Sequence, residues 1–146
     1  MSTARGTTFL AATALEEFWD TSMPLLYLGE WCCRFSRREY WQGLHGRLSE
    51  SPWVSLEARL EAMRTCDSLY NRVIVSLGDA LNELHGRNHS ARYWRILLGP
   101  WLHPYIATMF DRLARVDLAL KAHPNLISLG ISEETSIVPA GTAEFD

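Results

Sequence analysis

A short apolar run, Leu25 to Leu28, ends at Gly-Glu-Trp and constrains the fold of this chain more than any other segment. An unbroken apolar run of this length is typical of a strand that is buried on both faces, as in a parallel sheet. One such strand cannot pair its own backbone amides, so it needs partner strands from elsewhere in the chain or from outside it. We therefore predict an α/β protein with a strand over residues 25–29.

The longest helical pattern covers residues 52–85. Ser51 and Pro52 suit its first turn, because serine accepts a hydrogen bond from a free backbone amide and proline has no amide to satisfy. Gly86 is expected to cap its end. Apolar residues recur between these limits at three- and four-residue steps and so are expected to form one stripe facing the core; they are Leu56, Leu60, Met63, Tyr70, Val73, Leu77, Leu81 and Leu84.

Shorter elements flank this helix. Ser90 is expected to begin a second helix and Gly99-Pro100 to interrupt it. We expect one predominantly helical domain over residues 1–146, with amphipathic helices packed around a small parallel sheet that this chain does not complete. In chain order, the other elements are a short helix or ordered arm over residues 7–20, helices over 91–98 and 101–121, and an irregular tail with β-prone pieces over 125–146.

Composition narrows the class of function. The 146 residues carry a formal net charge of -3 with a pI near 5.9, so no global basic excess marks the chain for a nucleic-acid backbone. A local basic patch is still open. No window approaches the roughly 18 consecutive apolar residues of a membrane span, and the N-terminus lacks the pattern of a signal peptide. We predict a cytoplasmic protein with no nucleic-acid partner and no membrane span.

The three cysteines predict neither a disulfide nor a metal centre. Cys32 and Cys33 are adjacent in sequence, which suits an ordinary disulfide poorly, and Cys66 is far from both. The repeated two-residue spacing of a zinc site is absent. We expect reduced thiols that behave as small apolar side chains, and no metal site.

Glu30 follows the predicted strand directly. In open α/β proteins, ligands collect beyond the carboxyl ends of buried strands. Gly29 would let the backbone turn closely there, and Glu30 would act as a general base or accept a hydrogen bond from a hydroxyl group. The alternative is a turn glycine followed by an exposed acid and a core residue, Trp31.

A dense group of polar and aromatic residues lies at and after the end of the longest helical pattern. Together, amide, imidazole, guanidinium and aromatic groups can bind a sugar, a phosphate or a nucleobase. The alternative is that the tryptophans are core, His85 caps the helix and the arginines are solvated. The group comprises Asn82, His85, His89, Tyr93, Trp94, Arg95 and Trp101.

Several well-known signatures are absent from the sequence. It contains no Gly-rich phosphate loop, no His-Glu-x-x-His and no Gly-x-Ser-x-Gly. A nucleotide site would therefore have to be unorthodox or completed elsewhere.

Four blocks of sequence carry a family resemblance. They are FLAATALEEFWD, LLYLGEWCCRFSRREYW, LNELHGRNHSARYWRILLGPWL and MFDRLARVD, and they cover most of Phe9 to Asp117. In these blocks the chain resembles the N-terminal region of a transferase family found in bacterial surface-polysaccharide and O-antigen gene clusters. Members of that family are longer, with a C-terminal half that looks like a nucleotide-sugar glycosyltransferase. The resemblance implies part of a Rossmann-like N-terminal domain.

The resemblance also implies a two-domain transferase whose N-terminal domain supplies groups on the acceptor side. The acid after the predicted strand and the polar group after the longest helical pattern make Glu30 and His85 the candidate catalytic residues. For this arrangement, we expect Glu30 to lie near His85 and Arg95. The candidate substrate-binding residues are Gly29, Trp31, Asn82, Tyr93, Trp94, Arg95 and Trp101, and the family's other recurring features fall on Cys32, Gly99 and Pro100.

The chain ends at Asp146, before the expected C-terminal half. We therefore expect a truncated N-terminal portion that holds no cofactor by itself. The full-length protein would use a nucleotide-sugar donor, and the partners would be a sugar or nucleotide sugar and a C-terminal domain or partner subunit. The alternative is a non-catalytic helical module that docks on a partner subunit, or a truncated remnant that folds poorly.

Overall fold

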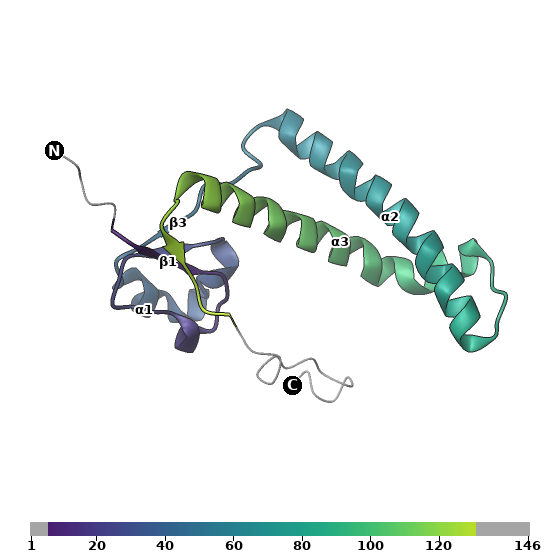
Figure 1. Cartoon of the computed structure of the whole chain (residues 1–146), viewed down its shortest axis with the longest axis horizontal. Coiled ribbons are helices and arrows are strands. Elements are labelled where there is room, and N and C mark those ends of the chain that lie inside the picture. Colours follow the sequence, from purple (N-terminus) through teal and green to yellow (C-terminus); the bar gives the residue numbers. More distant parts are fainter. Residues whose placement is uncertain (1–5, 131–146) are drawn as a thin grey trace. The chain divides into compact units, whose positions relative to one another are not determined.

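The computed structural model describes residues 6–130, which form a small sheet and two long helices (Figure 1). This α/β, predominantly helical fold confirms the predicted class. Short 3-10 helices at Glu16–Phe18, Glu30–Cys32 and Phe35–Arg37 lie in the loops on either side of the second strand. The strands are β1 (Thr8–Ala11), β2 (Leu25–Tyr27), β3 (Gly46–Leu48) and β4 (Leu126–Ile127), and the helices are α1 (Arg38–Gln42), α2 (Leu56–His85) and α3 (Ala91–Ala122).

The chain divides into two compact units. Among the described residues, the first contains the sheet and α1, and it is built from residues 6–48 and 125–130. The second, Ser49–Pro124, contains α2 and α3. The expectation of a single domain stays a prediction.

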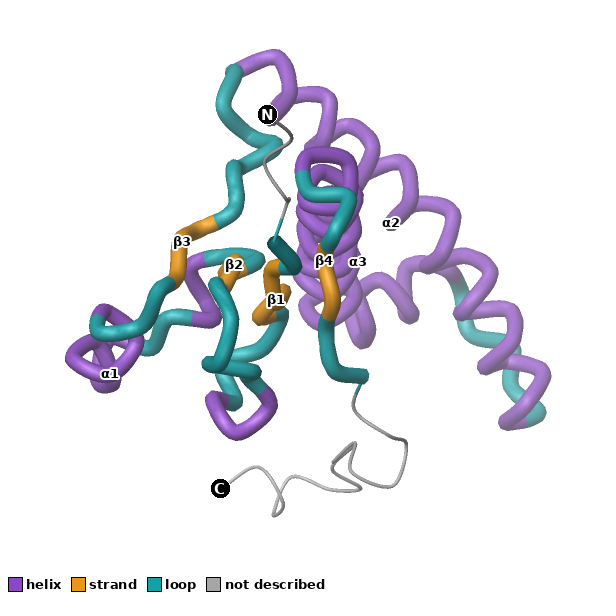
Figure 2. The backbone as a smooth tube through the Cα atoms, turned by 60° about the vertical axis from the view of Figure 1, so that its left-hand side comes forward, coloured by secondary structure: helices purple, strands orange, loops and turns teal. Residues whose placement is uncertain are grey.

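The sheet of the first unit has the order β3-β2-β1-β4, and each neighbouring pair is parallel (Figure 2). β1 is thus an inner strand, with Phe9 opposite Leu25 of β2 on one side and opposite Ile127 of β4 on the other. The core of this unit consists mainly of strand residues and their neighbours: Phe9, Leu10, Ala11, Trp19, Leu25, Leu26, Tyr27, Leu28 and Cys32 are all buried.

The expected helix or arm over residues 7–20 is wrong for its first part, which is strand β1. Phe9 is 3% exposed, and its backbone amide donates to the carbonyl of Pro24 at 2.9 Å. Alanine and leucine favour a helix locally, but pairing on both edges of the strand outweighs this weak preference. Only the 3-10 helix Glu16–Phe18 lies in the second part.

The other strands test the remaining sheet predictions. β2 begins at Leu25 as predicted, but it ends at Tyr27 rather than at residue 29 because the chain then turns into a 3-10 helix. β3 was not predicted, since all its residues are exposed and give no apolar pattern. The first β-prone piece of the tail contains β4, and the second, residues 136–138, lies outside the described residues.

The second unit is a hairpin of α2 and α3. The prediction that the apolar stripe of α2 faces the core is wrong at five of its eight positions, which are exposed: Leu56, Leu60, Met63, Val73 and Leu84. The expected helix start at Ser51 and Pro52 is wrong, because the Oγ atom of Ser55 accepts from the Ala58 amide at 3.1 Å and α2 begins after it. Gly86 caps α2 as predicted, with φ at 59° in the left-handed region that favours glycine. Ser90 caps α3 as predicted, and its Oγ accepts from the Tyr93 amide at 3.3 Å.

The two helices expected over residues 91–98 and 101–121 are one continuous helix, α3, with Pro100 and Pro104 inside it. A proline removes one hydrogen bond and usually bends or breaks a helix. Here the adjoining Gly99 is buried, and a Cβ atom at Gly99 would lie 2.8 Å from the Tyr70 hydroxyl of α2. Close packing between the helices therefore outweighs the local break.

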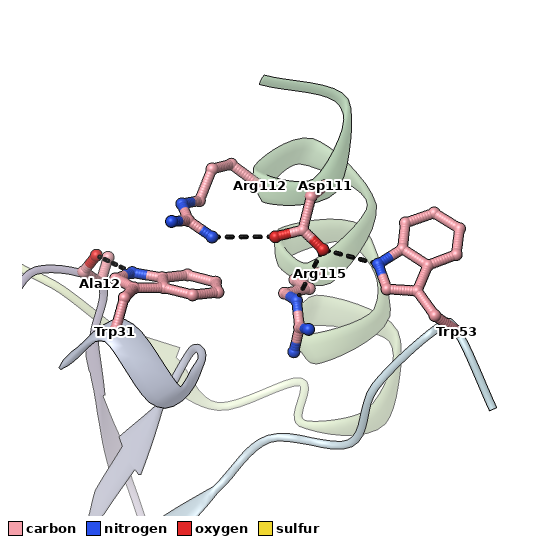
Figure 3. Close-up of polar contacts among 6 residues, drawn as sticks. All are labelled: Ala12, Trp31, Trp53, Asp111, Arg112 and Arg115. Atoms are coloured by element: carbon pink, nitrogen blue, oxygen red, sulfur yellow. Dashed lines mark hydrogen bonds and ion pairs between the residues drawn. The ribbon is translucent and has the colours of Figure 1, made fainter. Parts of the chain in front are cut away.

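A polar contact joins the start of this unit to α3 (Figure 3). The indole Nε1 of Trp53 donates to Asp111 at 2.6 Å, and Trp53 stacks on Phe110. Arg115 and Arg112 also donate to Asp111, at 2.9 and 2.8 Å. Burial raises the pKa of Asp111, but hydrogen bonds from Trp53 and Arg115 and both arginine charges outweigh burial and lower it overall.

Gly78 provides a test of the hairpin packing. A Cβ atom there would lie 2.7 Å from Trp94 Cδ1, and Trp94 is 6% exposed. Gly78→Ala should lower the free energy of unfolding by about 1–2 kcal/mol, because overpacking outweighs the gain in helix propensity. Asp79→Ala, at the next and exposed position, is the control and should be neutral or stabilising in the same denaturant titration. An equal increase in the free energy of unfolding for both variants would contradict the close packing of Gly78 against Trp94.

Candidate functional site

The turn that follows β2 depends on its glycine and tryptophan. A Cβ atom on Gly29 would overlap the indole of Trp31, so only glycine leaves room for that ring. The Trp31 Nε1 donates to the carbonyl of Ala12 at 3.3 Å (Figure 3), and the Cys32 Sγ donates to that of Ala11 at 3.2 Å. The turn is therefore bonded to the end of β1, and Glu30 projects from a fixed segment.

Glu30 lines a pocket of about 460 Å³ in the first unit. The walls come from the end of β2, the turn after it, the end of α1, and β3. They are mainly apolar and aromatic, with Tyr27, Trp41 and Leu48 among them. Glu30 is exposed and is the only carboxylate among the lining residues. The pocket thus combines aromatic faces with one group that can accept a proton.

Tyr27 forms the inner wall of this pocket. Its ring lies on Gly46, where a Cβ atom would meet it at 2.5 Å, and its hydroxyl donates to the carbonyl of Trp41 at 3.3 Å. Burial raises the pKa of Tyr27 to about 12. Burial, and then the nearby Cys32, also raise the pKa of Cys33. Both groups therefore stay protonated near neutral pH, and neither competes with Glu30 as a base.

A second, smaller hollow of about 250 Å³ lies at the carboxyl ends of β1 and β4. The chain proceeds from β1 to β2 and β3 on one side and returns to β4 on the other, so the strand order reverses between β1 and β4. Open α/β proteins place ligands at such a point. Its polar side chains are already engaged: the Thr13 Oγ1 accepts from the Leu15 amide, and the Ser128 Oγ donates to the carbonyl of Leu10.

In the second unit, Asn82 fastens the turn between the two helices. Its amide nitrogen donates to the carbonyl of His89 at 2.9 Å, and its Oδ1 accepts from the His89 amide at 2.9 Å and from the Trp94 indole at 3.2 Å. His89 stacks on Tyr93 with ring centroids 4.0 Å apart. Asn82 and Trp94, both candidate binding residues, therefore have structural contacts within the hairpin.

The other candidates of this unit lie apart. His85 is the exposed last residue of α2. Arg95 donates to the Oδ1 of Asn71 at 3.0 Å and lies over the ring of Tyr70. Asn71 and His85 are about 21 Å apart along α2 at the usual helical rise, so the hairpin does not bring Arg95 to His85. Glu30 belongs to the first unit, and its meeting with either residue stays a prediction.

Trp101 is 58% exposed and stacks on Tyr105, with centroids 5.0 Å apart. With Pro100, Pro104 and Thr108 these rings line an open hollow of about 580 Å³ on α3. The interpretation of Trp101 as a core residue is therefore wrong, whereas Trp94 is buried in the hairpin.

Two further properties concern residues 6–130. None of the helices there combines the length and the apolar character that crossing a bilayer requires. Within the same residues, histidine, cysteine, aspartate and glutamate nowhere form a group of three or more that could hold a metal ion.

The sequence model of the LIC12162 family transferases matches residues 8–146. The chain belongs to the LIC12162 transferase family. Searches of curated proteins and of solved structures found no match. The match confirms the expected membership of a transferase family, while the O-antigen setting of the LIC12162 chain stays a prediction.

Sequence reasoning named Glu30 but missed the residues that make its pocket in this LIC12162 family member. Tyr27 was assigned only to a strand, and Trp41 and Gly46 lie between that strand and the longest helical pattern, where no strand was predicted. The high aromatic and glycine content of that segment was the available signal. It could not show that Gly46 leaves room for the ring of Tyr27.

Asn82 offers a test of the turn between the helices. Asn82→Ala leaves a buried indole and two backbone groups of His89 without their partner, and it should lower the free energy of unfolding by roughly 2–4 kcal/mol. Asn71→Ala, which removes two exposed hydrogen bonds, is the control and should cost less than about 1 kcal/mol. Equal small losses in urea titrations would show that Asn82 does not fasten the turn.

The pKa of Tyr27 predicts alkaline destabilisation. The unfolded chain loses this proton near pH 10 and the folded chain near 12, so stability is full below about pH 10 and falls as pH rises towards 12. The loss attributable to Tyr27 should reach roughly 2 kcal/mol. Tyr27→Phe should flatten the fall in denaturant titrations from pH 9 to about 12, and exposed Tyr93→Phe should not. Identical slopes for the two variants would contradict the assignment.

Proposed function

We propose that the chain is the N-terminal, acceptor-side portion of a glycosyltransferase of bacterial surface-carbohydrate synthesis. Membership of a transferase family supports the class of reaction. One observation carries the rest: Glu30 lies three residues beyond the end of strand β2 and lines a pocket of about 460 Å³ with Tyr27 and Trp41. Ligand sites of open α/β proteins lie beyond the carboxyl ends of their strands, and Glu30 lies beyond the carboxyl end of β2.

The chemistry of this pocket suits an acceptor sugar. Aromatic rings such as those of Tyr27 and Trp41 pack against the apolar faces of sugars, and the polar edges of a sugar need hydrogen-bond partners. Glu30 accepts the proton of the acceptor sugar's hydroxyl group while the oxygen of that hydroxyl bonds to the anomeric carbon of the donor. The bond from that carbon to the leaving phosphate oxygen breaks in the same reaction.

The donor nucleotide is assigned to another part of the protein. In a dinucleotide-binding fold the first strand leads into a helix whose N-terminus binds phosphate. Here β1 is followed by a short 3-10 helix whose first turn carries Glu16 and Glu17. Two carboxylates disfavour phosphate at that position. A nucleotide-sugar donor is expected for the full-length protein, held by a C-terminal domain or a partner subunit, and the reaction would then be cytoplasmic.

The second unit supplies the remaining proposed groups. His85 is exposed and would steady the charge of the leaving phosphate, whereas Arg95 is held by Asn71, about 21 Å from His85 along α2, and does not share that role. The rings of Tyr93 and Trp101 are partly exposed, and each already stacks on one neighbour, His89 or Tyr105. Trp31 stays in the proposal as the ring that holds the Glu30 turn against Ala12.

The exposed face of α3 favours a second candidate function. The open hollow beside Trp101 and Tyr105 is lined largely by aromatic rings and prolines, and buried aromatic anchors are enriched at protein interfaces. A non-catalytic module that docks on a partner subunit would use this face. A purified chain that stays monomeric and stable, and whose partner binding is unaffected by Trp101→Ala, would exclude this candidate.

The catalytic proposal predicts that Glu30→Gln in the full-length protein reduces sugar transfer by about 10²–10⁴-fold, because the amide cannot accept the proton. His85→Ala should reduce transfer less, since it removes one charge-stabilising group. Glu17→Gln, an exposed acid on the turn after β1, is the matched control and should retain full activity. Unchanged turnover in both Glu30→Gln and His85→Ala would exclude the proposed roles.

A further inference from the structure

The segment from Arg34 to Tyr40 forms an exposed surface that the proposed reaction does not use. We define the basic-aromatic patch as Arg34, Phe35, Arg37, Arg38 and Tyr40. Every residue of the segment is exposed, and Phe35 is 77% exposed. The patch carries three of the 14 Lys and Arg residues of a chain whose net charge is -3. Glu39 lies in the same segment and Arg37 is paired with Glu16, so the segment keeps only a small basic excess on an acidic protein.

Arginine side chains cover the aromatic rings of the patch. The Arg38 guanidinium lies 4.7 Å from the centre of the Phe35 ring, and that of Arg37 lies 5.1 Å from the centre of the Tyr40 ring. Arg37 is also held by Glu16 at 2.6 Å. Arg34 and Arg38 form no ion pair with any carboxylate among residues 6–130. Two guanidinium groups therefore remain available beside an exposed ring.

The fold does not account for this arrangement. Phe35 makes little contribution to a core because three quarters of it faces solvent. A single exposed apolar residue is ordinary, but here the ring lies beside Arg34 and Arg38, which form no ion pair in the described part of the chain, although Glu16 acts electrostatically on Arg34 and Glu39 belongs to the same segment. An anionic bilayer surface can bind both the arginines and the Phe35 ring. Lipid phosphates accept bidentate hydrogen bonds from arginine, and the boundary with the acyl chains buries an aromatic ring.

We propose that the basic-aromatic patch docks this chain on the surface of an anionic phospholipid bilayer. Phe35 enters the boundary between headgroups and acyl chains, and Arg34 and Arg38 bind lipid phosphates. The net negative charge elsewhere on the chain disfavours other orientations on such a surface. This inference does not depend on the proposed sugar transfer, since it concerns where the chain is held and not what it catalyses.

Vesicle flotation tests the proposal on the whole chain. Vesicles of phosphatidylglycerol and phosphatidylcholine should carry the protein upward at low salt, and vesicles of phosphatidylcholine alone should not. Binding should weaken as salt rises, because the interaction of exposed charges is screened within about 10 Å at 0.1 M ionic strength. Equal binding to both kinds of vesicle, or binding to neither, would overturn the proposal.

Variants of the patch locate the contact. Arg34→Ala and Arg38→Ala should each weaken partitioning about fivefold, and Phe35→Ala on the order of tenfold. Arg38→Lys keeps the charge and should retain most of the binding. The controls are Arg64→Ala, whose side chain is 74% exposed, and Val54→Ala, at a residue that is 79% exposed.

Two results from these variants would contradict the assignment. Patch variants that bind like the control variants would place the contact elsewhere. Binding that Phe35→Ala leaves unchanged and that heparin fully competes away would assign the patch to a soluble polyanion rather than to a bilayer. Circular dichroism spectra of all variants should match that of the unchanged chain, because the patch residues contribute little to the core.

Discussion

Backbone pairing on both edges of β1 is the constraint on which the sheet and the candidate site depend. The Phe9 amide donates to the carbonyl of Pro24 just before β2, and the Thr8 amide donates to that of Asn125 just before β4. β1 therefore pairs with one strand that precedes the helical hairpin in the sequence and with one that follows it. With β2 fixed beside β1, the turn after β2 reaches the carbonyls at the end of β1. Trp31 and Cys32 bond there, and they hold Glu30 at the mouth of its pocket.

Small residues decide how closely the parts of each unit approach. Gly29 leaves room for the indole of Trp31, Gly46 for the ring of Tyr27, and Gly78 for the side chain of Trp94. In each case an aromatic ring lies where a Cβ atom would be, so the glycine acts through space and not through an unusual backbone angle. The pocket beside β2 and the packing of the hairpin therefore depend on the same kind of contact, in which an aromatic ring packs directly against the backbone of a glycine.

The sequence predicted β2 because a strand buried on both faces leaves an unbroken apolar run, and it predicted Gly86 and Ser90 because helix caps are local. It failed at β1, where alanine and leucine favour a helix until two partner strands are present, and at Pro100, where packing of Gly99 against Tyr70 continues the helix. Glu30 could be named from its place after a strand. Tyr27 and Trp41 could not, because their part in the pocket depends on tertiary contacts.

The central claim is that the pocket beside β2 receives a sugar. Nitrogen-15 NMR of the chain, titrated with glucose, galactose and N-acetylglucosamine, tests it most directly, because each tryptophan indole gives its own signal. The account predicts that at least one of these sugars shifts the Trp41 indole together with the Glu30 amide, and that Glu30→Gln weakens the response. Sugar-dependent shifts confined to Trp101 on α3, or no shift with any of the three sugars, would contradict it.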